Sequence, residues 1–203
     1  QVTTTGLDDV NLAYFIEKDL TLAHSPGTLS GVPLAEHALM WILCFAKNVV
    51  SNNLSHIAKE YSDGPFFGID TPRVICQEMA ELTLGLIGFG ASARELARRA
   101  WPLGMRIMAI DVIEFPQAEL DEFHVEFLGK PNQIDTVLSK ADYVSLHLHL
   151  NSKTRHIMGA HEFEMMKQSA VLINIARGAL VDEMALVQAL RTGNIRGAGL
   201  DVF

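Results

Sequence analysis

The sequence has little cysteine, no long hydrophobic run and no excess of basic charge. Its two cysteines, Cys44 and Cys76, form no CxxC pair, so we expect reduced thiols in a cytoplasmic protein rather than a disulfide framework. The longest nearly uninterrupted apolar stretch, Ala38 to Ala46, is far shorter than the ~20 residues that span a bilayer. We therefore expect no membrane association.

Basic residues are outnumbered by acidic ones, 16 against 24, which gives a net charge of −8. Because runs of Lys and Arg are also missing, we expect no nucleic-acid partner. Residues Gln1–Leu7 carry no secretory signal and the chain lacks an initiator Met, so we do not expect Gln1 to be a natural start. With 203 residues, of which 49% are apolar, the chain can bury one core, or one domain and an appendage.

The chain divides into an irregular part and a regular part. Before residue 82 we predict a short helix at Leu12–Lys18, a strand at Leu20–His24 and a connecting segment at 62–81. From residue 82, short apolar runs alternate with amphipathic stretches, the pattern of a doubly wound parallel α/β sheet. The predicted strands are Thr83–Ile87, Arg106–Ile110, Val125–Leu128, Tyr143–Leu148, Ala170–Ile175 and Arg196–Leu200. The predicted helices are Ala93–Trp101, Ile134–Ser139, Glu162–Lys167 and Glu183–Arg191.

An apolar stripe at helical spacing precedes the regular part. Its members recur at intervals of four, three, four and four residues: Leu34, Ala38, Trp41, Phe45 and Val49. A stripe this wide needs a partner surface, and a second copy of the chain would supply one. The stripe therefore predicts a homodimer, with packing on the chain's own domain as the alternative.

A glycine-rich loop follows the first strand of the regular part. Gly88-Phe89-Gly90-Ala91-Ser92-Ala93 comes directly after that strand and opens a helix, as in dinucleotide-binding folds. There the first glycine makes the tight turn, the second lets the backbone approach a pyrophosphate, and the helix start offers unpaired N–H groups. Taken alone, the hexapeptide could equally be an ordinary glycine-rich turn.

Asp111 supports the dinucleotide interpretation. It ends the second predicted strand and lies 111 − 88 = 23 residues after the first glycine, where such folds place an acid that accepts hydrogen bonds from the adenosine ribose. A carboxylate there repels a 2′-phosphate, and no arginine occurs within Val112–Glu114 to receive one. We therefore predict NAD rather than NADP as the cofactor.

An arginine follows another buried strand. Arg177 comes just after the apolar run Val171–Ile175, at the strand ends where open α/β sheets bind ligands. A guanidinium in that place can hold a substrate carboxylate through two hydrogen bonds. The alternative is a surface arginine in a connecting loop.

Six segments together resemble the D-isomer-specific 2-hydroxyacid dehydrogenases. They are Thr5–Val10, Ala35–Leu39, Leu84–Ala93, Ser145–Leu148, Asn174–Gly178 and Gly197–Phe203. In this family the NAD-binding domain interrupts the substrate domain. The resemblance thus implies an incomplete second, substrate domain that ends within 1–30, a connecting helix and linker at 31–81, and a dinucleotide-binding domain at 82–203. In relatives the connecting helix also builds the dimer.

The resemblance implies roles for individual residues. The loop from Gly88 to Ser92 would bind the cofactor, with the N–H groups of Ala91 and Ser92 on the pyrophosphate and Asp111 on the ribose. Three residues would line the dinucleotide cleft: Leu148, His149 and Thr154. The nicotinamide would lie beside Ile175 and Ala176, with its carboxamide on Asp201. The substrate carboxylate would bind the amides of Thr5 and Gly6 together with Arg177, the catalytic residue.

The chain departs from the family at several of these positions. The family often has Arg-Ile-Gly where this chain has Ala91-Ser92-Ala93, so one charged phosphate contact is missing. His149 replaces a common proline, and Ile175 often replaces a threonine. We expect these changes to weaken cofactor affinity without changing the class of ligand.

In relatives, a glutamate and a histidine beyond the segment that ends Asp-Val-Phe complete the catalytic group, and this chain ends at Phe203. The expected function is therefore NAD-dependent oxidation of a D-2-hydroxy acid, or reduction of a 2-keto acid, by a truncated chain that is inactive alone. A non-catalytic NAD(H)-binding or dimerisation module is the alternative. His147 and His149 share one face of a predicted strand, but no Cys, Asp or Glu stands nearby, so no metal site is expected.

Overall fold

The computed structural model of the protein describes residues 10–23, 27–50 and 76–203. Six parallel strands form one sheet in the order β3-β2-β1-β4-β5-β6. The strands are β1 (Thr83–Ile87), β2 (Arg106–Ile110), β3 (Val125–Gly129), β4 (Tyr143–Leu146), β5 (Val171–Asn174) and β6 (Gly197–Leu200). The helices are α1 (Leu12–Glu17), α2 (Gly31–Ala46), α4 (Ala91–Ala100), α5 (Gln117–Glu122), α6 (Ile134–Leu138), α7 (Ala160–Met165) and α8 (Glu183–Thr192). The predicted doubly wound parallel sheet is confirmed.

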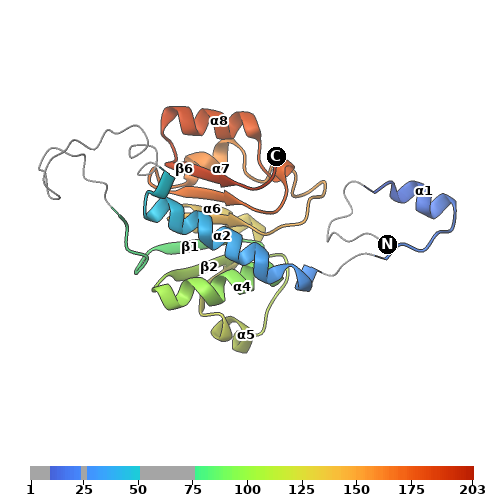
Figure 1. Cartoon of the computed structure of the whole chain (residues 1–203), viewed down its shortest axis with the longest axis horizontal. Helices are drawn as coiled ribbons and strands as arrows, with labels where there is room; N and C mark the ends of the chain where they lie inside the picture. The colour runs from blue at the N-terminus through green and yellow to red at the C-terminus, as the bar shows by residue number, and fades with distance from the viewer. Residues whose placement is uncertain (1–9, 24–26, 51–75) are drawn as a thin grey trace, which may run out of the picture.

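Helices cover both faces of this sheet (Figure 1). The apolar side chains of α2 and α4 join those of β1, β2 and β5 in one core. The side chains of α6, α7 and α8 form a second core on the opposite face. Because both faces are covered, every residue of β1, β4 and β5 is buried, which explains their near-continuous apolar sequences.

The predicted strands agree closely with the observed ones. The bounds of β1 and β2 match the predicted runs to the residue, and the other four strands differ by one or two residues at one or both ends. One predicted strand is wrong, because residues 20–23 are irregular; His24 lies outside the described residues. A lone strand has no neighbour to pair with, so its apolar residues do not suffice to form one.

Two helical predictions also need correction. The sequence pattern predicts no helix at residues 117–122, but α5 forms there after Pro116, which fixes the backbone just before the first turn. The long helix of the apolar stripe ends at Ala46. Val49 therefore lies beyond that helix, and its side chain is exposed.

The apolar stripe of α2 finds its partner surface within the chain. Ala38 is fully buried, and the rings of Trp41 and Phe45 pack against β6, where glycines leave room for them. The stripe thus packs on the chain's own domain, as in the alternative interpretation, and it gives no support to a second copy. The homodimer stays a prediction that rests on the family resemblance.

Within the described ranges, no helix combines the length and the apolar character that a bilayer crossing needs.

We predict that Gly199→Ala destabilises the fold. A Cβ at Gly199 would lie 2.9 Å from Cγ of Trp41 and 3.1 Å from Cδ1 of Ile173, so the indole must shift. We expect the free energy of unfolding in urea to fall by about 1–3 kcal/mol. Gly31→Ala is the matched control, because its nearest contact would be an ordinary 3.4 Å and it lies within a helix. Equal stability of the two variants would contradict this packing.

Candidate functional site

The carboxyl ends of five neighbouring strands meet at one edge of the sheet. Because all the strands are parallel, the residues that follow β1, β2, β4, β5 and β6 emerge on the same side. These residues include Gly88, Asp111, His147, Arg177 and Asp201. The edge therefore collects the residues that the sequence singled out from separate parts of the chain.

The turn after β1 requires a glycine. Gly88 has a φ of +94°, and a Cβ there would lie 2.8 Å from the carbonyl oxygen of His147. Its N–H donates to the carbonyl of Ile110 at 2.8 Å, and the side chain of Leu148 lies directly beside it. The predicted tight turn between the first strand and the helix is confirmed.

The Asp111 carboxylate fixes the same turn. Its Oδ2 accepts the Phe89 N–H at 2.7 Å, and its Oδ1 accepts the Ile113 N–H at 2.9 Å. The Phe89 ring is fully buried. The ring and the N–H of Phe89 thus both take part in building the loop, and its role as a cofactor contact stays a prediction. Asp111 keeps further lone pairs for a hydroxyl, because each carboxylate oxygen accepts more than one hydrogen bond.

Arg94 of α4 is hydrogen-bonded to the backbone of this loop. Its Nε donates to the Phe89 carbonyl at 3.1 Å, and its guanidinium lies 4.8 Å from the centre of the Phe115 ring. It also forms an ion pair with Glu119 of α5. Because these contacts engage the guanidinium, Arg94 does not replace the arginine that relatives often carry in the loop.

The start of α4 can accept an anion. Gly90 is its N-cap and supplies no capping side chain. A Cβ at Gly90 would meet nothing within 4 Å, so open space lies in front of the loop. The first-turn N–H groups, including those of Ala91 and Ser92, point out of the helix and carry its partial positive charge. This arrangement fits the pyrophosphate of a dinucleotide.

His147 lies behind the loop and is bonded through both ring nitrogens. Its Nδ1 is 2.8 Å from Ser92 Oγ, and its Nε2 is 2.9 Å from Ser145 Oγ. Burial lowers the pKa of His147 to about 3, so the ring is neutral near pH 7. His149, by contrast, is exposed. Among the described residues, no group of three His, Cys, Asp or Glu side chains could hold a metal ion.

The turn after β5 is shaped by the side chain of a buried asparagine, Asn174, for which the sequence predicts no role of its own. The Nδ2 of Asn174 donates to the Arg177 carbonyl at 2.9 Å, and its Oδ1 accepts the Ala176 N–H at 3.1 Å. Ile175 is buried, whereas Ala176 and Arg177 are partly exposed. The Nη1 of Arg177 donates to the Ala176 carbonyl at 2.7 Å. A polar residue in an otherwise apolar strand was the available signal for Asn174.

Asp201 follows β6 and contacts helix α2. Its Oδ1 lies 3.3 Å from Nε2 of His37, and the indole Nε1–H of Trp41 donates to the same His37 nitrogen at 3.2 Å. Asp201 is exposed, so its carboxylate stays accessible to a ligand. No local sequence pattern predicts this pairing, because His37 and Asp201 are far apart in the chain.

The loop after β4 is stabilised by hydrogen bonds within itself. Thr154 Oγ1 donates to the His149 carbonyl at 2.7 Å and accepts the Asn151 N–H at 2.9 Å. Thr154 thus shapes the loop that carries His149. The two predicted substrate residues Thr5 and Gly6 lie outside the described residues.

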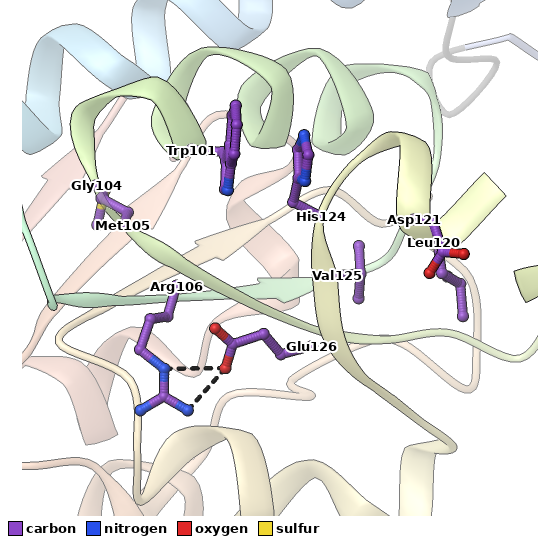
Figure 2. Close-up of a pocket in the computed structure, with 9 residues that line it drawn as sticks. All are labelled: Trp101, Gly104, Met105, Arg106, Leu120, Asp121, His124, Val125 and Glu126. Atoms are coloured by element: carbon purple, nitrogen blue, oxygen red, sulfur yellow. Dashed lines mark hydrogen bonds and ion pairs between the residues drawn. The ribbon is translucent and has the colours of Figure 1, made fainter. Parts of the chain in front are cut away.

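An open hollow of about 480 Å³ lies at the opposite end of the sheet (Figure 2). It begins where β2 and β3 begin, and Arg106 there donates to Glu126 at 2.7 and 2.9 Å. The rings of Trp101 and His124 stack beside it, with centroids 3.5 Å apart. Since Asp111 follows the other end of β2, this hollow is separate from the candidate cofactor site.

Comparison with known proteins identifies the family. The model of the D-isomer specific 2-hydroxyacid dehydrogenase, NAD binding domain, matches residues 41–203. The chain belongs to the D-isomer specific 2-hydroxyacid dehydrogenase family. It is 36% identical to an (S)-sulfolactate dehydrogenase of Chromohalobacter salexigens over 98% of the chain and 60% of that protein. It is 33% identical to a glyoxylate reductase of Thermococcus litoralis over 98% of the chain and 58% of that protein.

A solved structure supports the same assignment. The D-lactate dehydrogenase of Aquifex aeolicus, complexed with NAD and lactic acid, superposes with a TM-score of 0.84 at 29% identity. The alignment covers 98% of this chain and 56% of that one. The chain thus spans about 60% or less of the length of these relatives, and within that length it carries the NAD-binding domain of the family.

The depressed pKa of His147 predicts a loss of stability in mild acid. The unfolded imidazole titrates near 6.5 and the folded one near 3, so the unfolded state gains a proton first as the pH falls through this window. Stability is fully present above pH 6.5 and declines toward pH 3. When the pH is lowered from 7.5 to 5.0, the free energy of unfolding of the wild type, measured in urea, should fall by about 1–2 kcal/mol more than that of His147→Gln. Identical losses would show that His147 is not buried in its neutral form.

Proposed function

We propose that this chain belongs to an NAD-dependent oxidoreductase that oxidises the CH–OH group of a D-2-hydroxy acid, or reduces the corresponding 2-keto acid. The observation that carries the proposal is Asp111, whose carboxylate is held by the Phe89 and Ile113 N–H groups beside the open loop at Gly90. The relatives named for sulfolactate and glyoxylate support the substrate class. The free thiols of Cys44 and Cys76 are in keeping with a cytoplasmic enzyme.

The cofactor would lie along the carboxyl edge. The N–H groups of Ala91 and Ser92 would bind the pyrophosphate, and Asp111 would accept the ribose hydroxyls. Three residues would line the dinucleotide cleft: Leu148, His149 and Thr154. Further along the edge, Ile175 and Ala176 would contact the nicotinamide ring, with Asp201 accepting from its carboxamide. NAD, when bound, supplies the acceptor or donor of hydride.

The substrate would lie next to Arg177. A guanidinium past the end of β5 can bind the substrate carboxylate through two hydrogen bonds and polarise the neighbouring oxygen. Its place depends on Asn174, whose side chain bonds both the Ala176 N–H and the Arg177 carbonyl. The amides of Thr5 and Gly6 would complete the carboxylate site.

A non-catalytic NAD(H)-binding module is the second candidate. The observation that favours it concerns His147, which contacts Ser92 of the phosphate loop. Its ring is hydrogen-bonded through both nitrogens and is neutral. A ring held in this way is not available to take the hydroxyl proton. Cofactor binding is common to both candidates, and turnover distinguishes them.

The first test is cofactor discrimination. We expect the chain to bind NADH at least tenfold more tightly than NADPH in fluorescence titrations, because the Asp111 carboxylate repels a 2′-phosphate. Asp111→Ala should narrow this gap. The Nζ of Lys130 lies 3.1 Å from the carbonyl oxygen of Val112, the residue after Asp111. The double variant Asp111→Ala/Lys130→Ala should therefore bind NADPH more weakly than Asp111→Ala does. Equal affinities in the wild type would refute the role of Asp111.

The second test is turnover by the 203-residue polypeptide alone. We expect no NADH consumption above background with glyoxylate, pyruvate or hydroxypyruvate. Reduction of the keto group needs a proton donor, general acid catalysis contributes typically 10²–10⁴-fold, and Arg177 cannot be that donor because a guanidinium keeps its proton. Robust turnover that Arg177→Ala abolishes would show that a proton donor lies within these residues. His37, paired with Asp201, would then be the first imidazole to replace.

A further inference from the structure

Three hydrogen-bonded polar side chains connect the interior of the sheet to the phosphate loop. They run from Ser145 of β4 through His147 to Ser92 in the first turn of α4. The two links measure 2.9 Å, from Ser145 Oγ to Nε2, and 2.8 Å, from Nδ1 to Ser92 Oγ. The inner end is fully buried, whereas Ser92 is partly exposed at the open side of the loop. The imidazole of His147 thus bridges two hydroxyl groups in different environments.

The inner hydroxyl determines the direction of the hydrogen bonds. Ser145 is fully buried, and among the described residues the one hydrogen-bond partner of its hydroxyl is His147 Nε2. A buried O–H needs an acceptor, since leaving it unpaired is unfavourable. Nε2 must therefore accept, and a neutral ring then carries its single hydrogen on Nδ1. Burial lowers the pKa of the ring to about 3, which keeps it neutral near pH 7.

The direction at the inner end sets the direction at the outer end. With the hydrogen on Nδ1, the ring donates to Ser92 Oγ, and the Ser92 hydroxyl keeps its own hydrogen for another acceptor. In the opposite tautomer, Ser92 would donate to the ring. It would then present only lone pairs toward the loop, where they repel an anion.

We propose that Ser145 locks His147 in its Nδ1-protonated form, so that the Ser92 hydroxyl donates to a phosphate oxygen of the bound dinucleotide. The inference rests on the proposed binding of NAD(H) at this loop. Ser92 contacts the ligand, whereas His147 and Ser145 are positioning residues. The hydroxyl supplies a neutral donor in a loop whose Ala91 lacks the charged side chain that relatives often have there.

The first experiment reads the tautomer in the ligand-free chain. Protein labelled with ¹⁵N-histidine is measured by NMR near pH 7.5, with His147→Gln to assign the ring signals. We expect His147 to show a protonated Nδ1 and an unprotonated Nε2. Ser145→Ala should shift the ring toward the Nε2-protonated form, while Ser139→Ala, a serine in an exposed position, leaves it unchanged. An Nε2-protonated ring in the wild type overturns the proposal.

The second experiment measures NADH affinity. Ser92→Ala should weaken binding about tenfold, the usual effect of losing a hydrogen bond to a charged group. Ser92→Thr, which keeps the hydroxyl, should bind as the wild type does. Ser145→Ala should also weaken binding several-fold, although its side chain is buried beneath the loop and cannot reach the ligand. Thermal unfolding of each variant verifies that it is folded.

The two experiments separate the inference from the proposed function. If the wild-type chain does not bind NADH, the proposed function fails and the phosphate contact fails with it, whatever tautomer is observed. If the wild type binds NADH and Ser92→Ala binds equally well, only the inference is overturned. Weaker NADH binding by Ser92→Ala and Ser145→Ala, together with an Nδ1-protonated His147 ring, supports the whole series of hydrogen bonds from Ser145 to the phosphate.

Discussion

The parallel pairing of the strands is the constraint on which the candidate site depends. It brings the carboxyl ends of β1, β2, β4, β5 and β6 to one edge, although these strands are distributed over more than 100 residues of sequence. β1 lies between β2 and β4, so the Gly88 turn has Asp111 on one side and His147 on the other. This is the point where the strand order reverses, and open α/β sheets bind their ligands at such a point.

Polar side chains fix the loops along this edge. Asp111 holds the N–H groups of Phe89 and Ile113, Asn174 holds the turn that carries Arg177, and His147 joins β4 to the start of α4. Each engages partners within the chain itself, so the loops need no ligand to take their shape. Preorganisation of this kind lowers the entropy lost on binding. The same hydrogen bonds explain why Phe89 belongs to the scaffold although it lies within the glycine-rich motif.

The sequence predicts the strands well because both faces of the sheet are buried, and buried strands are marked by continuous apolar runs such as Thr83–Ile87. It also predicts the turn at Gly88, since only glycine tolerates that backbone. It does not predict what depends on three-dimensional neighbours. The stripe of α2 is compatible with a dimer or with the chain's own β6, and the packing of Trp41 and Phe45 on the β6 glycines distinguishes the two. Likewise, no local pattern reveals that Asp201 meets His37 or that His147 bridges two serines.

Binding of NAD(H) at the carboxyl edge of the sheet is the property on which both the proposed function and the role of Ser92 depend. Hydrogen–deuterium exchange of the chain with and without saturating NADH tests it most directly, because exchange locates the ligand along the backbone. We expect slower exchange in peptides that cover 88–93 and 174–177, with no change in peptides that cover 101–106 and 120–126, which line the hollow at the opposite end of the sheet. Protection at that hollow, or none at the loop that follows β1, would contradict it.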